Sequence, residues 1–311
     1  MTDAVPAPAA DVAARAAGVR AASPTSRRGR PELRRPAVLA TPGGVLGVVL
    51  LTSAVGLALL GPVVVGDRPF ASVAAPLQAP SAAHVMGTDD LGRDVLTMVV
   101  HGLRTSLVIA VGVVAIAGVI AVCVGALAGS HPGSLDDLLM RGTELVQVVP
   151  RFFLAVVVVA LFGARVSNVV LLLGVTSWTW TARVVRAETL SLRQRAFVEA
   201  ARSFGAGQTY ILRRHIAVSV LPTALVMLSV CASGAVLIEA GLGFVGLGDP
   251  DVVSLGSLAS NAQRFLRSAW WLTLFPGAAL LILILGINLV GDALGDAGSA
   301  RLGPVGLGST R

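Results

Sequence analysis

Few side chains in this 311-residue sequence could take part in covalent or metal chemistry. All 24 basic residues are Arg, so Schiff-base chemistry and the phosphate-binding loop of nucleotide hydrolases are excluded, since both require Lys. The four His residues are scattered and form no pattern of nucleophile, base and orienting group. We therefore expect no catalytic residue, no cofactor-binding residue and no metal ligand in this chain.

Three local patterns resemble chemical sites but have simpler explanations. The glycines at 241, 243 and 246 spell G-x-G-x-x-G, yet they end an apolar segment, where small residues favour close helix packing. His84 and Met86 lack the carboxylate or Cys neighbours that a soft-metal site would need. Cys123 and Cys231 lie in apolar segments and are expected to be buried small hydrophobes.

The elements that position these side chains are long apolar segments. The chain is 55% hydrophobic and 13% charged, whereas a soluble domain carries about a quarter charged residues. Five windows are nearly free of charge, and a sixth span is required to give Leu154–Gly163 a length of about 20 residues. The predicted spans are Pro36–Gly66, Thr105–Leu135, Leu145–Ala164, Val166–Thr181, Leu212–Ile238 and Ser268–Gly291. The sequence therefore predicts an all-α, polytopic membrane protein with six transmembrane helices.

The distribution of Arg predicts the orientation of these spans. The Arg/Ala/Pro-rich segment 1–36 has no helical periodicity and is expected to be a disordered cytoplasmic tail. With six spans, the predicted cytoplasmic segments hold seventeen Arg and the predicted outer segments six, in agreement with the positive-inside rule. Both termini are therefore expected in the cytoplasm, and the net charge of +7 is explained without a nucleic-acid partner.

Two ionisable residues stand out against the apolar spans. Arg151 lies about ten positions beyond Arg141, roughly 15 Å deep by helix rise, where insertion costs roughly 2.5 to 3.5 kcal/mol. Its candidate partners are Glu144 and Glu239, and it could either line a translocation path or form a structural ion pair. Glu239 ends the fifth span near the outer side, either on that path or as part of a polar rim.

The segment from Arg183 to His215 is too patterned to be a simple connection. Phe197, Ala200, Ala201 and Phe204 recur at helical spacing, while Glu199 can pair with Arg195 or Arg202 on another face. Gly205 tolerates the positive φ of a helix end, and a second helix can begin after Gly207. Such an amphipathic helix would also suit the lipid headgroup region.

Longer motifs decide between a lipid surface and a protein partner. The strings E-A-A-R-S-F-G (Glu199–Gly205), R-R-H-I (Arg213–Ile216) and V-L-P (Val220–Pro222) resemble the E-A-A loop of binding-protein-dependent ABC importer permeases. The second, C-type permease subunit of the dipeptide, oligopeptide and nickel group is similar over residues 84–296. Further matches to this group lie at His84–Val95, Glu239–Gly248, Leu274–Gly277 and Asn288–Asp292.

This resemblance implies the fold, the partners and the site. It implies a type I ABC importer transmembrane domain in the inner membrane, with a helix that docks in a groove of the ATPase. The implied coupling residues are Phe197, Glu199, Ala200, Ala201, Arg202, Phe204 and Gly205. The implied partners are a homologous permease, two ABC ATPase subunits or domains that bind ATP and Mg, an extracytoplasmic binding protein, a peptide substrate and membrane lipid. A nickel or other small-solute importer, or a channel or scaffold that uses the loop only for lipid, stays open.

Two departures from the family pattern affect local geometry. Ala217 and Val218 stand where the family has Leu-Pro, which shifts the expected helix break to Pro222, and Leu255 stands at a Trp position of the outer loop. The expected organisation is a tail at 1–36, a first transmembrane helix at 37–66 and an extracytoplasmic segment at 67–104. A permease core at 105–296 with a coupling loop at 183–219, and a cytoplasmic tail at 297–311, complete it.

Overall fold

The computed structural model describes residues 41–301, without the side chains of Arg213 and of residues 297–301. The predicted N-terminal tail 1–36 and residues 302–311 of the predicted C-terminal tail lie outside the described residues. Regular structure in the described range is helical, with two isolated β-bridges, Ser72 to Arg93 and Thr88 to Asp94. The predicted all-α class is confirmed.

The helices follow one another with short connections, except for the segment between the first two helices and the segment of residues 245–254. They are α2 (Pro42–Val65), α3 (Val95–Ser130), α4 (Ser134–Val148), α5 (Arg151–Phe162), α6 (Val166–Arg193), α7 (Ala196–Ser203), α8 (Gln208–Ile211), the π-helical turn η2 (Leu212–Ile216), α9 (Ala217–Phe244), α10 (Leu255–Ala262), the 3₁₀ turn η3 (Gln263–Phe265) and α11 (Trp271–Arg301).

Several of these helices are long and apolar enough to cross a membrane. By length and composition these are α2, α3, the continuous run Gln208–Phe244 and α11, with the pair α4 and α5 as a fifth candidate if it counts as one bent span. Helix α6 has 28 residues, but its Ser, Thr and Trp residues lower its hydropathy. The chain is thus multi-pass within the described residues, and the count of six spans stays a prediction.

The third predicted span, Leu145–Ala164, is wrong as a single helix. Val149 and Pro150 have extended backbone, and α4 and α5 meet there at an angle of 71°. The residue before a proline is disfavoured in the α conformation, and Pro150 itself has no N–H for the helix ladder. Arg151 is therefore the first residue of α5, and its depth cannot be counted along one helix from Arg141.

Other expected boundaries fall inside helices. Helix α3 begins at Val95, within the expected extracytoplasmic segment 67–104, because the Asp94 carboxylate caps it by accepting from the Thr97 N–H at 2.9 Å. Helix α6 continues to Arg193, beyond the expected end of its span at Thr181. The expected helix break at Pro222 is also wrong, since Pro222 lies inside α9 and the irregular turn is the π-helix that precedes it.

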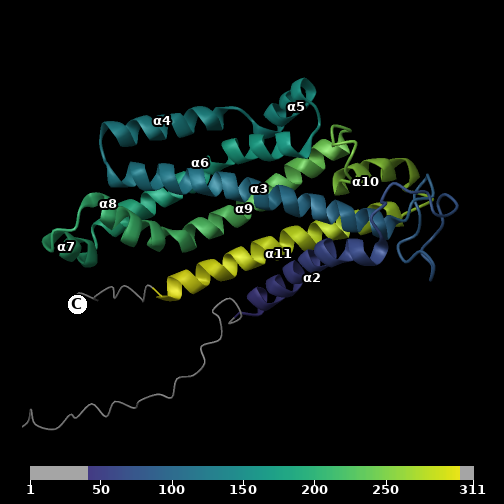
Figure 1. The fold of residues 1–311 in the computed structure, drawn as a ribbon, viewed down its shortest axis with the longest axis horizontal. Coiled ribbons are helices and arrows are strands. Elements are labelled where there is room, and N and C mark those ends of the chain that lie inside the picture. The colour runs from purple at the N-terminus through teal and green to yellow at the C-terminus, as the bar shows by residue number, and fades with distance from the viewer. Residues whose placement is uncertain (1–40, 302–311) are drawn as a thin grey trace, which may run out of the picture. The chain divides into compact units, whose positions relative to one another are not determined.

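Small residues bring the long helices close together (Figure 1). Helices α3 and α6 lie side by side, and a Cβ on Gly125 would approach the Ala182 carbonyl oxygen to 2.5 Å. The small residues of α3 at this point therefore pack against α6 of the same chain. Helix α2 packs on α11, where a Cβ on Gly47 would lie 2.6 Å from the Leu289 Cβ. Helices α7 and α8 lie at one end of the bundle and α10 at the other.

Candidate functional site

Helix α7 is a short element with a well-formed C-terminus. The Ala206 N–H donates to the Ala201 carbonyl and the Gly205 N–H to the Arg202 carbonyl, at 3.0 and 2.9 Å, which is the Schellman arrangement. Gly205 has a φ of +81°, a conformation that costs a residue with a side chain roughly 1 to 2 kcal/mol. The predicted helix end at Gly205 is confirmed, and so is a second helix after Gly207.

The inward face of α7 differs from the predicted stripe. Val198 is fully buried in a cluster with Leu192, Ile211 and Val220, and Ala201 packs at its edge. Phe197 and Phe204 point away from this cluster, and the Phe204 side chain is 91% exposed. Val198 was missed because two aromatic residues dominated the pattern, although its spacing from Ala201 fits one helix face.

The polar residues of α7 also face outward. Glu199 and Arg202 are exposed, and within the described residues Glu199 forms no ion pair with Arg195 or Arg202, so the predicted pairing is wrong. Ala200 and Gly205 are exposed as well. Of the seven predicted coupling residues, only Ala201 is partly buried. The outward surface of α7, formed by Phe197, Glu199, Ala200, Arg202 and Phe204, is thus a small, mixed apolar and charged surface on a rigid base.

Arg151 does not have the partners that its sequence position suggested. Glu144 instead contacts Arg183, with 3.7 Å between Oε1 and Nη2, and Glu239 bonds elsewhere. The Arg151 side chain forms no ion pair or hydrogen bond with any other described residue and is half-buried at the bend between α4 and α5. Within the described residues, Arg151 is therefore not part of a structural ion pair.

Glu239 is buried where α9 meets α10, with 6% of its surface exposed. Its Oε1 accepts a hydrogen bond from the Ser254 hydroxyl at 2.5 Å, and Ser254 caps α10. Oε2 has no hydrogen-bond partner among the described residues, although the Ser106 hydroxyl of α3 faces the same group. Glu239 is therefore not on an exposed polar rim, and Ser254 is a partner that sequence spacing did not indicate.

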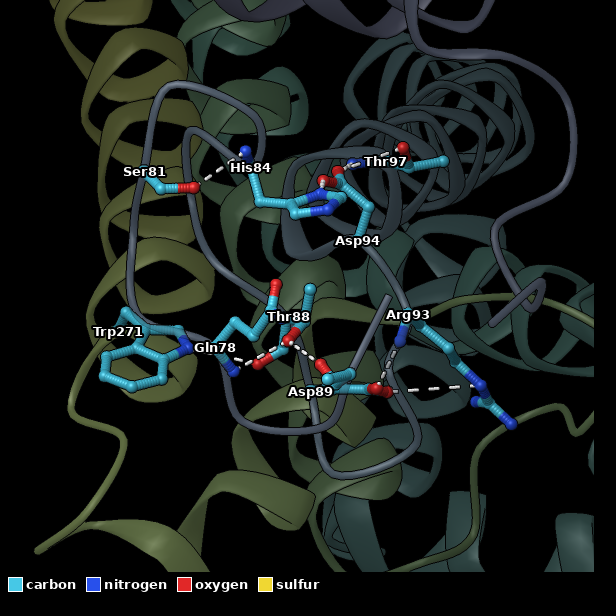
Figure 2. Close-up of polar contacts among 10 residues, drawn as sticks. Gln78, Ser81, His84, Thr88, Asp89, Arg93, Asp94, Thr97 and Trp271 are labelled. Atoms are coloured by element: carbon cyan, nitrogen blue, oxygen red, sulfur yellow. Dashed lines mark hydrogen bonds and ion pairs between the residues drawn. The ribbon is translucent and has the colours of Figure 1, made fainter. Parts of the chain in front are cut away.

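The segment before α3 forms a compact hydrogen-bonded turn (Figure 2). Thr88 donates to the Ala75 carbonyl and accepts from the Gln78 N–H, while its own carbonyl accepts from the buried Trp271 indole at 3.2 Å. Asp89 accepts the Leu91 and Arg93 N–H groups. Thr88 and Asp89 thus close this turn, and the cap of α3 is Asp94.

His84 lies in the same turn beside a carboxylate. Its Nδ1 is 3.0 Å from Asp94 Oδ2 (Figure 2), so it supports the residue that caps α3. The described residues contain no group of three or more His, Cys, Asp or Glu side chains placed to hold a metal ion. Nearby, a cavity of about 490 Å³ lies between this end of α3, the start of α6 and the loop before α10.

Comparison with known proteins assigns this arrangement to a family. The family described as binding-protein-dependent transport system inner membrane component matches residues 121–303, which include the α6–α9 segment and α7. The chain belongs to this permease family. It is therefore the membrane domain of a type I ABC importer, a kind of transporter whose permeases work with ATPase and substrate-binding protein partners.

Individual permeases resemble this chain over most of its length. A protein of Brucella suis biovar 1 (strain 1330), provisionally named a peptide transport system permease protein, is 37% identical over 259 residues, which cover 83% of this chain and 87% of that one. A dipeptide transport system permease protein of Alkalihalophilus pseudofirmus is 32% identical, covering 81% and 84%. A probable D,D-dipeptide transport system permease protein of Escherichia coli (strain K12) is 34% identical, covering 74% and 78%.

Proposed function

We propose that this permease moves peptides across the inner membrane, driven by ATP that its partner subunits hydrolyse. The outward surface of α7 is the docking site for an ATPase. The observation that carries this proposal is Phe204, which is 91% exposed at the end of a helix held in place by the buried Val198. A large apolar side chain left in water on a rigid base is stabilised by a protein partner that covers it.

The absence of Lys from the sequence indicates which subunits bind ATP. Without Lys, the chain cannot form a phosphate-binding loop of the usual kind, so ATP and Mg are bound by partners and not by this subunit. The partners are two ABC ATPase subunits or domains, a homologous permease and an extracytoplasmic binding protein that delivers the substrate. The support for peptide as the substrate is the names of the three similar permeases described above, all of which refer to peptides or dipeptides.

A channel or scaffold in which the segment from Arg183 to His215 only binds lipid would be a different class of function, and it is less well supported. The outward surface of α7 exposes Glu199 as well as Phe204, and a carboxylate is repelled by anionic headgroups. A nickel or other small-solute importer differs only in substrate, and assays of uptake with peptides and with nickel separate the two.

Replacing Phe204 tests the docking site. In the assembled complex, Phe204→Ala is expected to weaken ATPase binding about 30-fold, the loss of one interface hot spot of about 2 kcal/mol. Phe162→Ala is the matched control, since Phe162 is also 70% exposed but lies at the end of α5. Binding is measured by titrating the purified ATPase onto permease in nanodiscs. Equal affinity in wild type and Phe204→Ala, with ATP-driven uptake intact, would exclude α7 as the docking site.

Arg151 and Glu239 are our candidates for residues of the translocation path. Arg151 gives this proposal its best support, because its half-buried guanidinium has no ionic partner among the described residues. Such a charge is costly in a membrane unless it meets water or an anionic group of the substrate. Arg151→Gln should then reduce peptide uptake and substrate-stimulated ATP hydrolysis while the complex assembles normally. Unchanged uptake in that variant means that Arg151 has no role on the path.

A further inference from the structure

The segment that carries α7 is fastened at both ends to the same turn of another helix. Arg193, the last residue of α6, donates from Nη1 to the Gly129 carbonyl oxygen at 3.0 Å. Gln208, the first residue of α8, donates from Nε2 to the Ser130 carbonyl oxygen at 2.8 Å. Both acceptors belong to the last turn of α3, whose carbonyls have no partner within their own helix.

These two hydrogen bonds restrict the sliding of α7 relative to α3, which the apolar contacts alone would allow. Beneath α7, Val198 packs with Leu192, Ile211 and Ala126, and such contacts are non-directional, so the surfaces can slide. Hydrogen bonds require a defined distance and angle. Arg193 and Gln208 therefore set the position of segment 194–207 relative to the end of α3.

The end of α3 is in turn connected to α4. After the turn at residues 131–133, Asp136 near the start of α4 is buried and accepts two hydrogen bonds from Arg186 of α6, at 2.5 and 2.6 Å. Beyond α4 lies the bend at Pro150 that positions Arg151. Hydrogen bonds thus join both sides of α7 to the end of α3 and α6 to the start of α4, and the backbone continues from there to the bent pair.

We propose that Arg193 and Gln208 are positioning residues that transmit movement of α7 to the α3–α4 turn. The inference rests on the proposed docking of an ATPase at α7 and adds the route by which that docking acts on the membrane helices. Movement of α7 draws the last turn of α3 with it through the Gly129 and Ser130 carbonyls. Without the two bonds, α7 still binds the ATPase, but its apolar base slides against α3. The movement of α7 then does not reach the α3–α4 turn.

Isosteric and charge-removing variants test this route. Gln208→Glu keeps the size of the side chain but removes the N–H₂ donor, and Arg193→Met removes the donors and keeps most of the stem. Gln194→Glu and Arg195→Met are matched controls in the same segment, since neither wild-type side chain forms a hydrogen bond or ion pair within the part of the chain that the structure describes. Arg193→Lys retains a donor for the single bond to Gly129 and is the rescue variant.

The measurement is solute taken up per ATP hydrolysed by the full complex in proteoliposomes, together with ATPase binding. We expect the double variant Arg193→Met with Gln208→Glu to bind the ATPase like wild type, while uptake per ATP falls at least about fivefold, the lower range of couplings between sites. The two controls and Arg193→Lys should stay near the wild-type ratio. If the double variant does not fold, Gln208→Glu alone provides the test, with a smaller fall in the same ratio.

Two outcomes would overturn the inference, and a third concerns the proposed function. A wild-type ratio in the double variant means that the bonds carry no coupling. Loss of ATPase binding in that variant means that Arg193 and Gln208 shape the docking site and do not act after it. If the wild-type complex shows no ATP-driven uptake, the proposed function itself fails, and this result is distinct from the other two.

Discussion

Glu239 shows how a single buried carboxyl group can hold two helices together. It accepts from the hydroxyl of Ser254, the residue that caps α10, and its second oxygen lies in the same interior as the Ser106 hydroxyl. That second oxygen, unpaired among the described residues, costs free energy, which the bond to Ser254 partly offsets. The bond between α9 and α10 is the structural contribution that the contacts support.

The two oxygens of Glu239 lead to a test by substitution. Glu239→Ala removes the acceptor of the Ser254 hydroxyl and is expected to destabilise the permease by about 1 to 3 kcal/mol. Glu239→Gln keeps a carbonyl acceptor and should cost about half of that or less. The thermal unfolding midpoint of the purified complex measures both changes, and equal midpoints for the two variants would show that the bond to Ser254 contributes little.

At the scale of elements, hydrophobic windows and turn residues predicted most helices. Gly205 placed the end of α7 correctly, because left-handed backbone has a strong residue preference. The start of α8 after Gly207 was also predicted correctly, although Gly207 itself has extended backbone. The inward side of α7 was not predicted, since exposure of Phe197 and Phe204 depends on what lies beneath the helix. The bond from Glu239 to Ser254 also joins residues whose proximity only the tertiary fold determines.

Pro150 illustrates a limit of a different kind. The need for about 20 residues to cross a membrane favoured one continuous helix, although the proline was visible in the sequence. Local backbone preference determined the conformation, and the segment bends by 71°. At Pro150 the backbone preference outweighed the length argument, whereas Pro222 lies inside α9 without breaking it.

The contact between α9 and α10 gives a prediction at this scale. A Cβ on Gly256 would lie 2.0 Å from the Ala240 carbonyl oxygen, so Gly256→Ala must push α10 away from α9. We expect a loss of about 1 to 3 kcal/mol, as in other overpacked sites, read as a lower unfolding midpoint. Gly234→Ala is the control, because nothing lies within 4 Å of the added methyl group and Ala favours a helix. Equal midpoints in the two variants would mean that α10 adjusts freely.

For the whole molecule, the arrangement of helices places the turn before α3 and the end of α7, each with an exposed serine, at opposite ends of the bundle. Ser81 lies in the turn before α3, at the α10 end of the bundle, and Ser203 lies at the end of α7. The positive-inside count assigns the first to the outer side and the second to the cytoplasm. This orientation and the number of six spans were predicted from charge and length, and accessibility in cells directly measures the side on which each serine lies.

Cysteine labelling provides that measurement. In a variant with Cys123 and Cys231 replaced by Ala, a membrane-impermeant maleimide added to intact cells should label Ser81→Cys and not Ser203→Cys. In inside-out vesicles the labelling should reverse. Labelling of both sites from the same side would contradict the six-span arrangement.

The bend between α4 and α5 also has a consequence for biosynthesis. Helix α5 has 12 residues, about 18 Å by helix rise, which is well short of the roughly 30 Å hydrocarbon layer. It is followed after three residues by α6, against which it packs. During translation α5 cannot settle in the bilayer by itself, so we expect it to leave the translocon together with α6 as one hairpin.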